Sequence, residues 1–314
     1  MRNIVFLSSF FMLLLVAGCV DNKRGIDVSN SETEKLVSEV SALRMSAEDD
    51  ASLSYELGKK LFELDLAKAK VRNVRSGNEP FLLEDKNNKQ CVVLAHGFTA
   101  SPWEVRELGE FLAEKNISVY GVLVAGHGTT REDLASTKWE NWFTSFENAY
   151  SALSFMCGDV FVGGVSAGGS LALYLAENNR TKGVISLASM VYPRNENAKF
   201  AFLVKFFKPY FENGLDDSEK PYYYSFRPTA AVAELIDFMD VFKINLDKVK
   251  VPVLIMQYNN DSTVNPESAC FIYNSIGSES KELVWFDGSD HVLTTGKDKL
   301  EVFDRVYNFI VENS

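Results

Sequence analysis

A strand that turns sharply at a serine into a helix is the feature that most constrains this fold. Residues 159–170 read DVFVGGVSAGGS, an apolar run that ends in the pattern G-x-S-x-G centred on Ser166. A serine at so tight a turn has a strained backbone and a side chain exposed at the end of the strand. The glycines remove Cβ atoms that would collide there. The pattern predicts a nucleophilic serine, although alone it would also fit an ordinary glycine-rich turn.

Strand-like and helix-like segments alternate beyond Gly77, which is typical of a parallel sheet with helices on both faces. We expect strands at 91–95, 118–124, 160–163, 183–188, 251–257 and 282–286, with a weak early strand at 81–83. Helices are expected at 103–115, 139–155, 171–177, 266–276 and 298–313. The sequence therefore predicts one α/β domain over residues 77–314, with a mostly parallel central sheet.

Charge and composition exclude several classes of function. The net charge is −11, and such an acidic chain repels nucleic-acid phosphates. The 46% of hydrophobic residues suffices for a packed core. The sequence shows no Cys/His cluster with zinc spacing and no dinucleotide-type glycine pattern. We therefore expect no nucleic-acid partner, no metal and no organic cofactor.

The first thirty residues are expected to be a targeting segment and a tether. The apolar run at 4–16 suits a secretion signal, since a membrane-spanning helix takes about 20 apolar residues. It ends in LVAGC, which resembles the lipobox of bacterial lipoproteins. The resemblance implies a signal peptide at 1–18, a lipid on Cys19, a tether at 19–30 and a membrane of the bacterial cell envelope. An ordinary secretory signal is the alternative.

Residues 31–76 are predicted to be a helical segment. Apolar stripes recur at helical spacing, at Leu36, Val40 and Leu43 and again at Leu53, Leu57, Leu61 and Leu64. Such stripes usually mark a packed face, so we expect this segment to pack against the main domain. A stalk close to the membrane is the alternative.

Three cysteines follow Cys19 in the chain, at Cys91, Cys157 and Cys270. Cys91 and Cys157 lie at the starts of two strands that this arrangement would place side by side. An oxidising compartment would permit a disulfide between them. Because free cysteines are common in buried cores, we expect two buried free thiols instead.

One long segment, at about 190–249, interrupts the alternation of strands and helices. It is dense in aromatic residues, at Tyr192, Phe200, Phe202, Phe206, Phe207, Tyr210, Phe211, Tyr222, Tyr223, Tyr224 and Phe226. We interpret it as a small helical cap inserted between core strands, with an apolar inner face suited to an acyl chain. A helical insertion with its own core and no further role is the alternative.

The base that would activate Ser166 must come from three histidines. In enzymes built on this serine turn the chain order is nucleophile, acid, base. His96 and His127 precede the serine, and we expect them to shape their loops. His291 follows the last predicted strand, so the sequence predicts it as the base.

The acid should lie in the loop after the penultimate strand, at 251–257. Asp261 lies there and would fix the tautomer of the His291 ring and stabilise its protonated form. Asp287 and Asp290 are rivals, but Asp290 adjoins His291 in the chain, which makes a hydrogen bond to that ring awkward. We therefore predict Asp261.

Two backbone N–H groups must stabilise the oxyanion that forms when serine attacks a carbonyl. One should come from the residue after the nucleophile, Ala167. The other should come from the loop after the first core strand, where Phe98 is the candidate.

Five motifs in chain order resemble those of the bacterial carboxylesterases and monoacylglycerol lipases, a group of α/β-hydrolases also described as serine aminopeptidase-like. They are 96–102 (HGFTASP), 125–129 (AGHGT), 139–142 (WENW), 163–169 (GGVSAGG) and 288–292 (GSDHV). The resemblance covers residues 80–314 and implies a triad of Ser166, Asp261 and His291, oxyanion donors Phe98 and Ala167, and a small cap over an acyl pocket. Ala167 departs from the family, where Met or Leu is frequent, which implies a wider pocket floor.

We therefore expect a serine hydrolase that cleaves carboxylic esters, with short-to-medium acyl esters or monoacylglycerols as substrates, held at a membrane through Cys19. The sequence leaves two alternatives. A serine aminopeptidase-like enzyme would use the same triad on peptides, with acidic cap residues such as Asp216 and Asp217 binding the amino terminus. A surface lipoprotein that keeps the fold as a binding module would have no activity.

Overall fold

The computed structural model describes residues 31–46, 50–85, 90–178, 180–288 and 290–314. The predicted signal peptide, the tether and the lipidation site Cys19 lie outside these residues. Within the described ranges, no helix is both long and apolar enough to cross a membrane.

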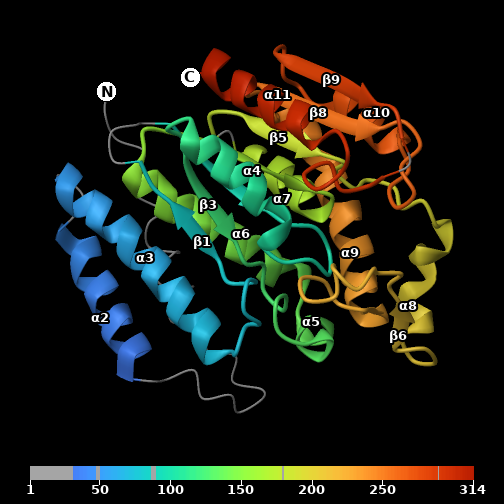
Figure 1. Ribbon diagram of the computed structural model, residues 1–314, viewed down its shortest axis with the longest axis horizontal. Helices are drawn as coiled ribbons and strands as arrows, with labels where there is room; N and C mark the ends of the chain where they lie inside the picture. The colour runs from blue at the N-terminus through green and yellow to red at the C-terminus, as the bar shows by residue number, and fades with distance from the viewer. Residues whose placement is uncertain (1–30, 47–49, 86–89, 179, 289) are drawn as a thin grey trace.

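A seven-stranded sheet forms the centre of the molecule, in the order β1-β3-β2-β4-β5-β8-β9 (Figure 1). β1 runs antiparallel to β3, and each of the other neighbouring pairs in this sheet is parallel. The carboxyl ends of the parallel strands therefore meet at one edge, where the loops that follow them gather. The strands are β1 (Phe81–Leu83), β2 (Gln90–Ala95), β3 (Ser118–Val122), β4 (Asp159–Val165), β5 (Val184–Leu187), β8 (Val253–Tyr258) and β9 (Lys281–Phe286).

Helices cover both faces of this sheet. Successive residues of β2 alternate between the faces, so that Cys91 and Val93 join the core under α6 and α7, whereas Val92 and Leu94 join the core under α4 and α11. Strands buried on both sides must be apolar throughout, which explains the uninterrupted apolar runs. The predicted fold class is confirmed. The helices are α4 (Trp103–Glu114), α5 (Arg131–Ser136), α6 (Trp139–Met156), α7 (Ala167–Ala176), α10 (Glu267–Ser275) and α11 (Lys299–Glu312).

The N-terminal helices α2 (Ser31–Ser46) and α3 (Ala51–Val71) pack on each other, and α3 packs in turn on α6 (Figure 1). A Cβ on Gly58 of α3 would lie 2.5 Å from the carbonyl oxygen of Ala152, so glycine permits this close crossing. The Tyr120 hydroxyl of β3 donates to Asp65 of α3 at 2.7 Å. The segment therefore packs against the main domain, as its apolar stripes predict.

The cap is inserted between β5 and β8. Its main helix, α9, contacts α5, α6 and α7 of the main domain. The insertion also contains a two-stranded antiparallel sheet, β6 with β7, which the prediction of a helical insertion lacks. The elements of the cap are η1 (Glu196–Phe200), α8 (Ala201–Val204), β6 (Tyr210–Glu212), β7 (Phe226–Pro228), α9 (Thr229–Phe242) and η2 (Lys243–Lys248).

The expectation of two free thiols at Cys91 and Cys157 is wrong, because the two form a disulfide with Cα atoms 6.2 Å apart. Cys91 lies in β2, and Cys157 follows the last residue of α6, just before β4. β2 and β4 are neighbours, with Cys91 opposite Val160, so the sheet brings the two sulfurs together. Closing a 66-residue separation restricts the unfolded chain and stabilises the fold by roughly 2–4 kcal/mol. Cys270 is free and exposed.

Candidate active site

Ser166 lies in the turn between β4 and α7. Its φ of 54° and ψ of −118° are unusual for a residue with a side chain, and such strain persists only where the surroundings fix it. The Ser166 N–H donates to the carbonyl of Leu187 in β5 (2.8 Å), and its own carbonyl accepts from the N–H of Ser170 (3.1 Å). Both bonds fix the turn at the carboxyl end of the central strand.

The glycines around Ser166 allow α7 to approach β2. A Cβ on Gly164 would lie 2.5 Å from the carbonyl oxygen of Ala95, and a Cβ on Gly168 would collide with the same oxygen. α7 begins at Ala167 rather than at residue 171 as predicted, because the glycines of its first turn serve this close packing and do not break the helix.

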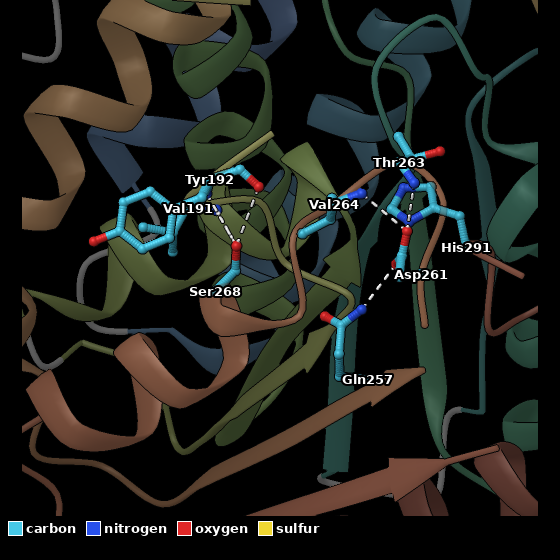
Figure 2. Close-up of polar contacts among 8 residues, drawn as sticks. All are labelled: Val191, Tyr192, Gln257, Asp261, Thr263, Val264, Ser268 and His291. Carbon is cyan, nitrogen blue, oxygen red and sulfur yellow. Dashed lines mark hydrogen bonds and ion pairs between the residues drawn. The ribbon is translucent and has the colours of Figure 1, made fainter. Parts of the chain in front are cut away.

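Figure 2 shows the predicted base and acid in direct contact. His291 Nδ1 lies 2.7 Å from Asp261 Oδ2. Because the carboxylate accepts, Nδ1 carries the proton and Nε2 is left as the acceptor that a base needs. The two rivals are placed differently: Asp290 is exposed, and Asp287 is exposed and accepts from the Asn259 side chain at 2.7 Å.

The carboxylate of Asp261 is fully buried and held by four donors (Figure 2). Oδ1 accepts from the N–H groups of Thr263 (2.7 Å) and Val264 (2.9 Å), and Oδ2 accepts from Gln257 Nε2 (2.8 Å) as well as from His291. A buried charge is tolerated only when it is satisfied in this way.

The start of the cap braces this acid loop. The N–H of Arg194 donates to the carbonyl of Thr263 (2.9 Å), and the N–H of Asn265 donates to the carbonyl of Tyr192 (2.9 Å). On the other side of Tyr192, its N–H donates to Ser268 Oγ of α10 (2.9 Å; Figure 2). The first residues of the cap therefore hold the loop of Asp261 in position.

Ser166 and His291 share no hydrogen bond among the contacts between described residues. Both lie near one buried carboxylate, Glu104. A Cβ on Gly97 would lie 3.4 Å from Ser166 Cβ and 3.3 Å from Glu104 Oε2, and His291 is close enough to lower the pKa of the Glu104 carboxyl, although burial raises it more. Hydrogen bonds between nucleophile and base are often long in free enzymes and tighten with substrate.

Phe98 and Ala167 each present a backbone N–H that donates to no other described residue. Ala167 is the first residue of α7, so its N–H lies at the positive end of that helix. Phe98 lies in the loop after β2, which closes through a bond from the N–H of Ala100 to the carbonyl of Gly97 (3.2 Å) and a left-handed Thr99 (φ 67°). Two free donors, one on the residue after the serine and one in the loop after β2, suit a developing oxyanion.

Both of these residues line a narrow cleft. Its walls are apolar: Trp142 comes from α6, Leu171 from α7 and Phe238 from the cap helix α9. This lining therefore suits an apolar group held between the main domain and the cap, beside the free N–H groups of Phe98 and Ala167.

His96 and His127 are buried side by side, with ring centroids 4.9 Å apart. His96 Nδ1 donates to the carbonyl of Gly97 (2.9 Å), and its Nε2 accepts from the N–H of Val124 (3.2 Å), so it ties the loops after β2 and β3 together. His127 Nδ1 donates to the carbonyl of Ala125 (3.1 Å), and burial lowers its pKa to about 4. Both rings therefore shape their loops, as the sequence predicts.

Glu104, in the first turn of α4, is a buried carboxylate that the motifs did not reveal. Its Oε2 accepts the N–H of Gly97 (2.6 Å), its Oε1 accepts the hydroxyl of Tyr223 (2.8 Å), and its carbonyl accepts the hydroxyl of Thr294 (2.6 Å). Burial raises the pKa of this carboxyl. One residue thus joins the Phe98 loop, the cap and the segment after His291. An acidic residue on the apolar stripe of a predicted helix, with Leu108 and Leu112, was the available signal.

The described residues contain no group of three or more His, Cys, Asp or Glu side chains arranged to hold a metal ion.

The chain is similar to known proteins along most of its length. The sequence pattern described as "Alpha/beta hydrolase family" matches residues 92–304. The chain is 32% identical over 251 residues to the thermostable monoacylglycerol lipase of Bacillus sp. (strain H-257), covering 77% of this chain and 97% of that protein. It is 28% identical over 230 residues to the carboxylesterase of Bacillus subtilis (strain 168), covering 72% and 94%. A solved structure from work on LipS and LipT, two metagenome-derived lipolytic enzymes, has a TM-score of 0.72 and 29% identity, covering 76% and 99%.

Proposed function

This chain belongs to the alpha/beta hydrolase family and is a carboxylic ester hydrolase, and we propose that it cleaves short-to-medium acyl esters, including monoacylglycerols, with Ser166, His291 and Asp261. The observation that carries the triad is the 2.7 Å contact between His291 and Asp261 at the sheet edge that also bears the strained Ser166. The names of the Bacillus relatives support the substrate class.

In the proposed reaction, His291 Nε2 takes the proton of Ser166 Oγ as that oxygen attacks the ester carbonyl. The N–H groups of Phe98 and Ala167 donate to the oxyanion, and Asp261 stabilises the protonated imidazole. His291 then gives its proton to the departing alcohol, which leaves an acyl group on Ser166. Water attacks this acyl-enzyme with His291 again as the base, and the acid and the free serine are released.

Peptide hydrolysis by the same triad is the second candidate, and the acidic residues of the cap are its only support. Asp217 pairs with Lys220 at 2.6 Å, and Glu219 Oε2 accepts the N–H of Asp216 at 2.9 Å. None of these carboxylates lines the apolar cleft. The arrangement fits a solvated surface and favours an apolar acyl substrate.

A graded substrate panel tests the proposal. We expect p-nitrophenyl esters of short and medium acyl chains and the matching monoacylglycerols to be hydrolysed, with kcat/KM at least about 100-fold above that for aminoacyl anilides, because no group in the cleft binds an ammonium. Phe238→Ala widens the cleft and should move the preference toward longer chains. Faster turnover of the anilides than of the esters would overturn the proposal in favour of a peptidase.

Glu104→Ala is expected to lower kcat for ester hydrolysis about 10- to 100-fold. The Gly97 N–H and the Tyr223 hydroxyl would each lose a buried acceptor, at a cost of about 1–3 kcal/mol for each donor, and the Phe98 loop would shift. Glu104→Gln keeps one acceptor for Gly97, and the Tyr223 hydroxyl can accept from its amide, so most of the rate should return. We would measure kcat, KM and the unfolding temperature of both variants. A lower unfolding temperature with an unchanged kcat would show that Glu104 stabilises the fold without positioning the Phe98 loop.

We also propose that the enzyme is anchored in the bacterial cell envelope through a lipid on Cys19. The support is the LVAGC sequence that closes the apolar run at 4–16. Replacing Cys19 by serine should abolish incorporation of radiolabelled palmitate, and incorporation that persists in this variant would contradict the assignment.

A further inference from the structure

The cap carries an exposed aromatic surface that the proposed reaction does not use. Phe206 and Phe207, in the turn after α8, are 76% and 89% exposed. The sequence predicts an inner aromatic face for the cap, but these side chains face outward and do not line the cleft. We call this the cap aromatic surface; its members are Phe200, Phe202, Leu203, Phe206, Phe207 and Phe211.

An ordered backbone holds these side chains in solvent. The N–H groups of Phe207 and Lys208 both donate to the carbonyl of Val204, at 2.9 and 2.8 Å, so the turn continues from α8. Thr229, the buried first residue of α9, donates through Oγ1 to the carbonyl of Lys208 (2.5 Å) and through its N–H to that of Pro209 (2.8 Å). The exposure of the aromatic rings is therefore built into the fold.

Lysines lie beside three rings of the cap aromatic surface. The ammonium groups of Lys199, Lys205 and Lys208 lie 5.4, 5.6 and 4.3 Å from the ring centroids of Phe200, Phe206 and Phe211. Residues 196–211 contain these three lysines and one glutamate, a surplus of two positive charges in a chain of net charge −11. Apart from Glu196, the acidic residues of the cap begin at Glu212. The positive charge is thus concentrated where the apolar side chains are exposed.

Exposed apolar patches of this kind mark interaction surfaces, and the charges select the partner. Aromatic rings settle at the headgroup level of a bilayer, and lysines beside them pair with anionic lipid phosphates. We propose that the cap aromatic surface docks the enzyme on an anionic phospholipid bilayer, with Phe206 and Phe207 inserted.

Docking in this orientation would serve the proposed substrate class. The helix that supports the cap aromatic surface through Thr229 is α9, which also contributes Phe238 to the cleft. A bilayer bound at this surface would lie beside the helix that walls the acyl site. Acyl esters dissolved in the membrane would then reach the cleft without crossing water.

Vesicle co-sedimentation tests the docking on a chain that begins at residue 20, which cannot carry the lipid but keeps every helix, strand and core cluster described above. We expect it to bind phosphatidylcholine vesicles that contain phosphatidylglycerol, and to bind less as salt screens the charges. Phe206→Ser combined with Phe207→Ser should weaken binding at least about tenfold, because two rings leave the apolar phase. Leu300→Ser on α11, where the native side chain is 66% exposed, is the matched control and should bind as the parent does.

The contribution of the lysine charges to vesicle binding is tested with a second pair of variants. Replacing Lys199, Lys205 and Lys208 by glutamine should remove the preference for phosphatidylglycerol. The same change at three lysines of α2 and α3, Lys35, Lys68 and Lys70, should leave it in place. All variants should hydrolyse soluble p-nitrophenyl acetate at the parental rate, so a failure of docking is separate from a failure of the proposed function.

Two outcomes would overturn the proposal. The double phenylalanine variant could bind vesicles as tightly as the parent, which would remove the surface from membrane binding. Alternatively, the parent could form a dimer that the variant loses while vesicle binding stays unchanged, which would assign the surface to a second copy of the chain.

Discussion

Replacing Ser166 by alanine is expected to lower ester hydrolysis at least about 10⁴-fold, since loss of the catalytic serine costs about 10⁶ in kcat in well-studied serine proteases. The same variant should no longer react with a fluorophosphonate, because only the activated oxygen of Ser166 can form the bond to phosphorus. Initial rates on p-nitrophenyl butyrate and mass spectrometry of the labelled protein measure the two effects. Labelling that persists in Ser166→Ala would assign the nucleophile to another residue.

Ser170→Ala is the matched control for this prediction. Ser170 lies one turn further along α7 and is also buried, and its hydroxyl donates to the carbonyl of Met190 at 2.9 Å. The Ser170→Ala variant should still react with the fluorophosphonate. That result would show that losing a buried serine next to this turn does not by itself abolish labelling. A parent protein that no probe labels would instead favour the binding-module alternative.

The sequence alone was enough to predict features that depend on local pattern or chain order. Each core strand is a run of apolar residues, so its approximate position follows from hydropathy. Ser166, Asp261 and His291 could be predicted because the serine turn has a distinctive sequence and because the acid and base must follow it in order. That logic chose Asp261 over Asp287 and Asp290, and the structure places Asp261 against the ring.

Features that depend on how distant segments meet could not be predicted in the same way. Glu104 accepts hydrogen bonds from Gly97, which lies in the loop before α4, and from Tyr223 and Thr294, which are distant in the chain. The disulfide depends on the end of α6 meeting β2. The aromatic content predicted an inserted cap, but not whether its rings face the cleft or the solvent. Hydropathy alone cannot distinguish a pocket wall from an exposed surface.

The α5 helix was also absent from the helices that the sequence predicted. It spans six residues, and its N-cap Thr130 accepts the N–H of Asp133 at 3.2 Å. A threonine followed by acidic residues is a helix-start signal, but a helix of this length lacks the repeated apolar stripe that would make it visible. Its single buried residue, Leu134, is anchored by tertiary packing.

Asp261→Asn is expected to lower kcat about 10⁴-fold near pH 7, the size of the effect that the same change has in a serine protease triad. The reason lies in the donors around the carboxylate. An asparagine oxygen in place of Oδ1 would keep its bonds from Thr263 and Val264, which leaves an NH₂ group in place of Oδ2. Gln257 can turn its unpartnered Oε1 toward that group. The His291 ring has no such freedom and must present a bare Nδ1, so the proton moves to Nε2 and the ring can no longer accept the proton of Ser166.

Asp287→Asn is the matched control, because it makes the same chemical change on an exposed carboxylate that contacts Asn259 rather than His291. It should retain the parental kcat. Measuring kcat and KM of both variants on one ester separates the tautomer effect from weaker binding, since the Asp261 variant should lose kcat with little change in KM. A circular-dichroism melt then shows whether the buried loop survives. An Asp261→Asn enzyme that folds and works within about tenfold of the parent would mean that the carboxylate does not set the state of His291, and that the proposed triad is incomplete without another acid.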